Sequence, residues 1–159
     1  MDQAQAESGI RPPTDPQIPQ IRRAALNLLA RREHARQELA NRLNVRFDRA
    51  LVAQVLDNLA AEGLQSDARF LTRFIAAKIQ RGQGPLKIAH ALRTKGIPQS
   101  AIQEALHPHA ADWPDHARQA AQRKFGNTPP PTFQARQKRQ RFLATRGFPT
   151  ELCHHLFRQ

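Results

Sequence analysis

Histidines and acidic residues lie close enough in one segment of the sequence to suggest a metal site. His107, His109, Asp112 and His116 fall within ten residues, and Asp112 and His116 would share one face of a helix. A zinc site needs three or four ligands at a fitted spacing and further groups that orient them. The run His107-Pro108-His109 is instead typical of a turn between two structural units. We therefore expect neither a metal nor a cofactor.

No other residues form a recognisable catalytic pattern. His154 and His155 are adjacent, so they would point about 100° apart on a helix and could not hold one ion together. Cys153 is the single cysteine, which excludes an internal disulfide and fits a reducing cytoplasm. A reactive thiol needs a basic, exposed setting, so we interpret Cys153 as a small buried residue. The segment "RGQGP" lacks the Lys-Ser/Thr of a phosphate-binding loop.

The acidic residues give no better support for catalysis, and we expect the protein not to be an enzyme. Two acid pairs are explained as helix caps and as partners of basic residues: Glu33 with Glu38, and Asp112 with Asp115.

Positive charge is the strongest compositional feature. The net charge is +12, with 20 Arg and 5 Lys against 13 acids. No acid lies between Asp67 and Glu104, a stretch with 7 basic residues, or between Asp115 and Glu151, a stretch with 8. Such a distribution favours a polyanionic partner or an acidic protein surface over a face that is merely solvated.

We expect the contacts with that partner to come from the acid-free stretches. The candidates are Arg73, Arg81, Arg93, Arg123, Lys124, Arg136, Lys138 and Arg141. Lys138 and Arg141 are three positions apart and would share a helix face, which Arg123, Lys124 and Arg136 would widen. The alternative surface is the middle of the chain, around Arg73, Arg81 and Arg93.

A repeated sequence indicates which elements position these residues. "LRTKGIPQSAIQEAL" begins at Leu92, and "LATRGFPTELCHHLF" begins 51 positions later. In both, a helix ends in a basic residue that suits its C-terminal dipole, glycine closes it, and proline precedes the next helix. We expect a positive φ at Gly96 and Gly147. A period of this length is typical of stacked structural units.

A third, more divergent copy precedes these two. In "RLNVRFDRALVAQVLDNL", Asn44 could replace the closing glycine and Asp48 is a suitable N-cap. Each copy has a pair of apolar residues five apart that could pack across the turn: Phe47 with Val52, Ile97 with Ile102, and Phe148 with Cys153. Alternation typical of strands is absent, so we predict helices only.

The pattern predicts an all-α, elongated, tandem array of three three-helix repeats. The expected helices are Gln20–Arg32, Ala35–Asn44, Arg49–Ala61, Ser66 or Asp67 to Ile79, one from Pro85, one after Pro98, Asp112–Phe125 with Asp112 as cap, Gln134–Arg146 and Thr150–Phe157. The expected boundaries are a disordered leader at 1–19 and repeats at 20–63, 64–110 and 111–159. With no membrane-spanning run or signal sequence, we expect a soluble, cytoplasmic monomer.

Four segments in this order resemble the RecX family: "LLARREHARQELANRL", "LDNLAAEGLQSDARF", "RGQGPLKIAHALRTKGIPQSAIQEAL" and "RQKRQRFLATRGFPTELCHHLF". The sequence departs from the family pattern in places. Ala35 stands where a serine cap is common, which should weaken the start of its helix, and Leu28 stands where an aromatic is common. Arg139 occupies a core register, where its methylenes could pack while its head reaches water.

The resemblance implies a regulator of the RecA recombinase. RecX proteins are elongated three-helix arrays that bind the RecA filament on single-stranded DNA, and they restrain strand exchange, ATP hydrolysis and RecA-promoted cleavage of the SOS repressor. Two alternatives stay open on the residues alone. A basic helical protein could bind DNA or RNA directly, or the chain could be a scaffold that binds only proteins. Dependence on RecA distinguishes the first from a filament regulator, and a shallow salt dependence would indicate the second.

Overall fold

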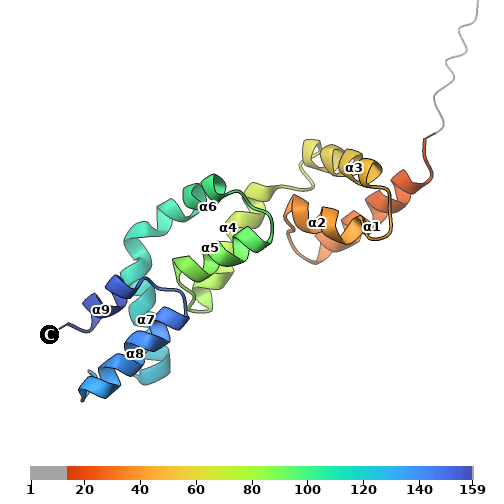
Figure 1. Ribbon diagram of the computed structural model, residues 1–159. Helices are drawn as coiled ribbons and strands as arrows, with labels where there is room; N and C mark the ends of the chain where they lie inside the picture. The colour runs from red at the N-terminus through yellow and green to blue at the C-terminus, as the bar shows by residue number, and fades with distance from the viewer. Residues whose placement is uncertain (1–13, 159) are drawn as a thin grey trace, which may run out of the picture.

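The computed structural model describes residues 14–158, and in that range all of the regular secondary structure is helical (Figure 1). Its elements are α1 (Gln17–Arg31), α2 (Arg36–Leu43), α3 (Arg49–Ala61), α4 (Asp67–Gln80), α5 (Pro85–Thr94), α6 (Gln99–Leu106), the 3₁₀ helix η1 (His107–Asp112), α7 (Trp113–Phe125), α8 (Phe133–Thr145) and α9 (Thr150–Leu156). The helices pack in groups of three along an elongated molecule, and η1 joins α6 to α7. This confirms the predicted fold class.

The predicted turns are present at the repeated glycines. Gly96 has φ of 80° and Gly147 has φ of 94°. Beside Gly96, the Ile97 N–H donates to the Leu92 carbonyl at 3.2 Å, which satisfies a carbonyl at the end of α5. Phe148 donates to Leu143 in the same way at 3.1 Å. The apolar residues that follow the two glycines are buried, as the spacing predicted.

The first copy of the turn is built differently from the prediction. Asn44 has φ of −63°, so it does not replace the left-handed glycine. The chain instead continues for one more tight turn, in which the N–H groups of Arg46 and Phe47 both donate to the Leu43 carbonyl. The side chain of Asp48 then caps α3 by accepting from the N–H groups of Ala50 and Leu51, as predicted.

Three other local expectations need correction. Asp112 does not cap α7, because it ends η1 with a helical backbone, whereas a capping residue needs an extended one. α1 begins at Gln17, so the last three residues of the expected leader are helical, while residues 1–13 lie outside the described part of the chain. The guanidinium of Arg139 contacts protein groups as well as water. Its Nη1 donates to the Thr128 carbonyl at 2.7 Å, and it lies 5.3 Å from the centre of the Phe125 ring.

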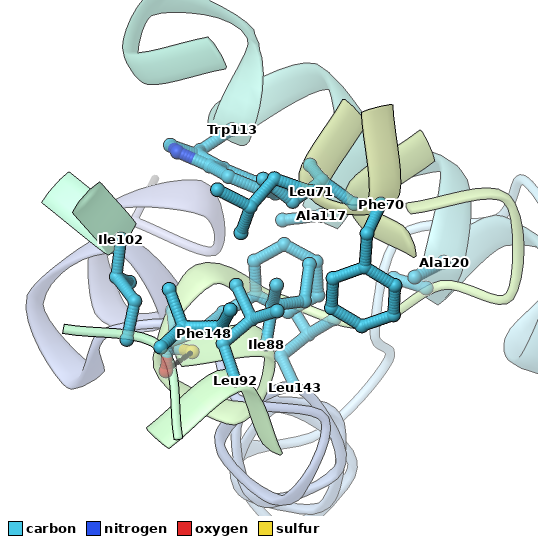
Figure 2. Close-up of a cluster of buried hydrophobic side chains, with 14 of the residues drawn as sticks. Phe70, Leu71, Ile88, Leu92, Ile102, Trp113, Ala117, Ala120, Leu143 and Phe148 are labelled. Carbon is cyan, nitrogen blue, oxygen red and sulfur yellow. Dashed lines mark hydrogen bonds between the residues drawn. The ribbon is translucent and has the colours of Figure 1, made fainter. Parts of the chain in front are cut away.

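The buried side chains form two separate clusters. The first joins α1, α2 and α3 and is made by Ile21, Ala25, Leu39, Leu43, Val52, Val55, Leu56 and Leu59. The second joins α4–α9, so the second and third repeats share one core (Figure 2). Its largest members include Phe70, Ile75, Ile88, Leu92, Ile102, Trp113, Leu143 and Phe148. From the first repeat only Ala35 belongs to this second cluster.

Candidate anion-binding groove

A groove of about 480 Å³ lies where the first and second repeats meet. Its walls come from the end of α1, one side of α4 and the end of α5. The lining residues are Arg31, Arg32, Glu33, Phe70, Arg73, Phe74, Ala77, Lys78, Arg81 and Lys95. Six of these are basic and one is acidic, and that one, Glu33, is paired with Arg69. The groove is therefore strongly cationic.

The spacing of residues on α4 explains how this wall forms. Arg73, Ala77 and Arg81 recur every four residues and so lie in one row along the helix. The parallel row of Phe70, Phe74 and Lys78 begins in the core and ends at the groove. α4 thus presents apolar rings and cations side by side.

The phenylalanine rings of α4 position two ammonium groups. The Nζ atom of Lys78 lies 5.2 Å from the centre of the Phe74 ring, and that of Lys95 lies 5.7 Å from the same ring. Lys95 is also 5.9 Å from the Phe70 ring. An ammonium over an aromatic face is attracted to its negative charge density. The rings therefore hold both cations on the floor of the groove.

Lys78 is a half-buried cation of the groove. Burial lowers its pKa, and the positive charges of Arg81, Lys95 and Lys87 lower it further. Within residues 14–158 no carboxylate pairs with it. A cation in this position gains from any anion that enters, because the ligand relieves both the burial and the repulsion between like charges.

A second hollow continues the cationic surface to the junction of the second and third repeats. It is lined by Arg81, Gly82, Ala120, Arg123, Lys124, Phe142 and Arg146. Arg81 lines both hollows, and we call the two together the basic groove. Arg123 donates to the Gln80 carbonyl at 2.9 Å, so the partly negative C-terminus of α4 helps to hold it.

Four of the residues predicted from the sequence line the basic groove: Arg73, Arg81, Arg123 and Lys124. The other four do not. Arg93 donates to Gln99, and Arg136 lies half-buried beside the segment 126–130. Arg141 faces a small hollow between α8 and α9, and Lys138 is exposed on α8.

Five basic residues of the groove were not predicted from the sequence: Arg31, Arg32, Lys78, Lys95 and Arg146. Lys78 could have been found because Phe70, Phe74 and Lys78 follow one another at a regular spacing of four. Lys95 and Arg146 occupy the same position in consecutive copies of the repeated sequence, just before the turn glycine. That shared position was interpreted only as a favourable helix end, although it also places a cation at each junction.

The described residues hold neither a metal-binding cluster nor an exposed cysteine. Within 14–158 no three His, Cys, Asp or Glu side chains are grouped so that they could hold a metal ion. Cys153 is 1% exposed, and burial raises the pKa of its thiol. No helix in this part of the chain has the length and apolar character needed to cross a membrane.

Fold and groove together define a tandem array of three-helix repeats with a cationic surface. Models of the first, second and third three-helix domains of RecX match residues 22–59, 66–106 and 112–157. The chain belongs to the RecX family.

Relatives and solved structures agree with this assignment. Regulatory protein RecX of Halorhodospira halophila is 42% identical over 132 residues, which is 82% of each chain. The protein of the same name from Pseudomonas putida strain GB-1 is 41% identical over 137 residues, covering 86% of this chain and 88% of the relative. The crystal structure of RecX from Lactobacillus salivarius has a TM-score of 0.73 at 18% identity, and it covers 87% of this chain and 93% of that one. A crystal structure of regulatory protein RecX has a TM-score of 0.72 at 23% identity, covering 88% and 71%.

Proposed function

We propose that this protein is a non-enzymatic regulator that binds the RecA filament on single-stranded DNA. In this role it restrains recombinase and ATPase activity and the cleavage of the SOS repressor. Its relatives bear the name regulatory protein RecX, and the family resemblance supplies RecA as the partner. The observation that most supports the proposal is the basic groove, which spans both junctions between repeats.

The shape of the cationic surface suits a filament better than a small ligand. Cations are distributed along three consecutive repeats, and Arg81 connects the two hollows. A filament presents DNA phosphates and acidic side chains at regular intervals, so an elongated partner can bind several at once. Each phosphate that is bound releases counterions, which makes such binding strongly dependent on salt.

We further propose that the protein acts as a monomer in the cytoplasm. The large apolar side chains exposed within residues 14–158 are Val45, Leu64, Leu86 and Phe133. They lie on four different segments, and scattered residues of this kind do not form the contiguous patch typical of a stable dimer interface.

A second candidate function is direct binding of single-stranded nucleic acid. It is favoured by the half-buried cations of the groove, Lys78 and Lys95, which would bind a phosphate without any help from RecA. The two functions differ in whether the effect on DNA requires the recombinase.

The test is the RecA ATPase on single-stranded DNA, with the protein titrated in. Arg73→Glu combined with Arg81→Glu should require at least about tenfold more protein for the same inhibition, equivalent to about 1.4 kcal/mol of binding free energy. Both side chains are exposed, so stability should change by only about ±0.5 kcal/mol. The salt dependence of binding should flatten by about one slope unit for each phosphate that the variant no longer binds.

Two matched variants complete the experiment. Arg42→Glu with Arg49→Glu makes the same change of charge on exposed positions of the first repeat outside the groove, and it should inhibit like the parent. Lys138→Glu with Arg141→Glu tests the surface of α8 that the sequence favoured. If the α8 pair abolishes inhibition and the groove pair preserves it, the binding surface is on α8. Strong retardation of naked single-stranded DNA in the absence of RecA would instead indicate a direct nucleic-acid binder.

A further inference from the structure

The two junctions between repeats use equivalent positions but different bonds. Gly84 is the residue before α5 and packs directly against the turn at Gly147. Its N–H donates to the Arg146 carbonyl at 2.7 Å, and the Leu86 N–H donates to the Gly147 carbonyl at 2.9 Å. A Cβ atom at Gly84 would lie 2.6 Å from the Gly147 backbone, so this close approach requires glycine.

The first junction makes different bonds. Ala35 precedes α2 as Gly84 precedes α5, but the turn glycine of the second repeat, Gly96, packs against a side chain: a Cβ atom on it would lie 2.6 Å from Cγ of Gln37. In residues 14–158 no backbone–backbone hydrogen bond joins helices α1–α3 to helices α4–α6. The Ala35 N–H instead donates to Oε1 of Glu38 at 3.3 Å.

Glu38 connects the repeats in place of the missing backbone bonds. Its Oε2 atom accepts from Nζ of Lys95 in the second repeat at 2.9 Å and from Nη2 of Arg32 in the first at 3.0 Å. Burial alone would raise the pKa of Glu38, but the hydrogen bonds from Arg32, Lys95 and the Ala35 N–H outweigh it and lower the pKa to about 2. We call this arrangement the Glu38 bridge.

The remaining interactions across the first junction are also mostly polar. Nε of Arg69 donates to Glu33 at 3.1 Å, and the Arg36 N–H donates to Asp67 at 2.9 Å. Ala35 is the single residue of the first repeat in the core shared by the second and third repeats. Polar and charged interactions therefore hold the first repeat on the second, whereas buried apolar side chains join the second repeat to the third.

The Glu38 bridge uses cations that also line the basic groove. Arg32 and Lys95 are in its wall, while Glu38 lies behind them with 11% of its side chain exposed. We propose that Glu38 is an internal anion that competes with the groove's ligand. While it holds Lys95 of the second repeat, the first repeat is fixed on the second, and a phosphate or carboxylate that binds Lys95 in its place releases the first repeat.

This mechanism makes the first junction the place where the relative orientation of two repeats can change. The second and third repeats move as a unit, and the first repeat changes its orientation when an anion occupies the groove. The inference rests on the proposed function only in taking the groove as the site that an anionic partner occupies.

The test measures distances between pairs of nitroxide labels on the full chain by pulsed electron paramagnetic resonance, without RecA. One pair, at Asn58→Cys and Gln103→Cys, spans the first junction, and the other, at Gln103→Cys and Gln137→Cys, spans the second. All three positions are exposed, and native Cys153 is too buried to be labelled. Sodium tripolyphosphate is the anionic probe, compared with sodium chloride at equal ionic strength.

We expect tripolyphosphate to broaden and shift the 58–103 distances more than sodium chloride does, while the 103–137 distances stay constant. Glu38→Gln should broaden the 58–103 distances without any added anion. Glutamine keeps an oxygen to accept the Ala35 N–H but lacks the charge that holds Lys95 and Arg32. The matched control is Glu62→Gln, which removes the exposed ion pair with Arg22 inside the first repeat. It should leave both distances unchanged.

Either of two results would overturn the proposal. One is a 58–103 distribution in Glu38→Gln identical to that of the parent, and the other is an equal effect of tripolyphosphate and sodium chloride. Both are independent of RecA inhibition by the groove variants, so failure of the Glu38 bridge and failure of the proposed function are distinguishable.

Discussion

At the scale of single residues, the contribution of a glycine to stability depends on the residues that pack against it. Gly147 and Gly63 both close a helix with positive φ, 94° and 74°. A Cβ atom on Gly147 would lie 2.4 Å from Cβ of Lys87 and 2.6 Å from its backbone nitrogen, whereas one on Gly63 would meet nothing within 4 Å. Both positions need a residue that can adopt positive φ. Only Gly147 also needs a residue without a Cβ atom, because its neighbours leave no room for one.

We expect Gly147→Ala to lower the free energy of unfolding by more than about 2 kcal/mol, because strain at positive φ adds to a clash with a rigid backbone. Gly63→Ala should lower it by only about 1 kcal/mol, from strain alone. Urea denaturation of both variants and the parent measures the difference. Equal destabilisation would show that the neighbourhood of Lys87 relaxes at no cost.

The sequence predicted the positive φ at Gly147 but not its neighbour. The conformation follows from local residues, namely the basic helix end before the glycine and the proline after it. Lys87, in contrast, lies 60 positions earlier and reaches Gly147 only when two repeats pack together. For the same reason, Lys95 and Arg146 could not be recognised from the sequence as groove residues, because they line the groove only where two repeats pack together.

At the scale of helices, capping depends on the residues before the cap. Asp48 follows a tight turn, has an extended backbone and accepts from two N–H groups of α3. Asp112 follows a 3₁₀ helix, has a helical backbone and makes no capping bond. The residue types alone predict a cap at both positions, because nothing in the sequence pattern indicates that His107–Asp112 is itself helical.

The two aspartates make a matched pair for mutation. Asp48→Ala should cost about 1 kcal/mol, the usual contribution of an N-cap. Asp112→Ala should stay within about ±0.5 kcal/mol of the parent, as expected for a surface residue without a special role. Thermal unfolding followed by circular dichroism gives both values. A destabilisation at Asp112 as large as that at Asp48 would contradict this account of α7.

At the scale of the whole molecule, the array has three repeats but two cores. The periodic pattern of the sequence predicted the repeats, because each copy of the turn and its apolar pair is local. It could not predict that the second and third repeats share a core while the first has its own. That division reflects how neighbouring repeats meet: Gly84 packs directly against the Gly147 turn of the third repeat, whereas the first repeat meets the second mainly through polar bonds such as Glu38 with Lys95.

Two core substitutions test whether the molecule has two stability units. Leu56 belongs to the first cluster and Leu143 to the second, and both are fully buried. Each change to alanine should cost about 2–5 kcal/mol locally. In native-state hydrogen exchange, Leu56→Ala should lower the protection of α1–α3 alone, and Leu143→Ala should lower that of α4–α9 together. Reduced protection along the whole chain in both variants would show instead that the polar first junction transmits stability as well as the apolar second one.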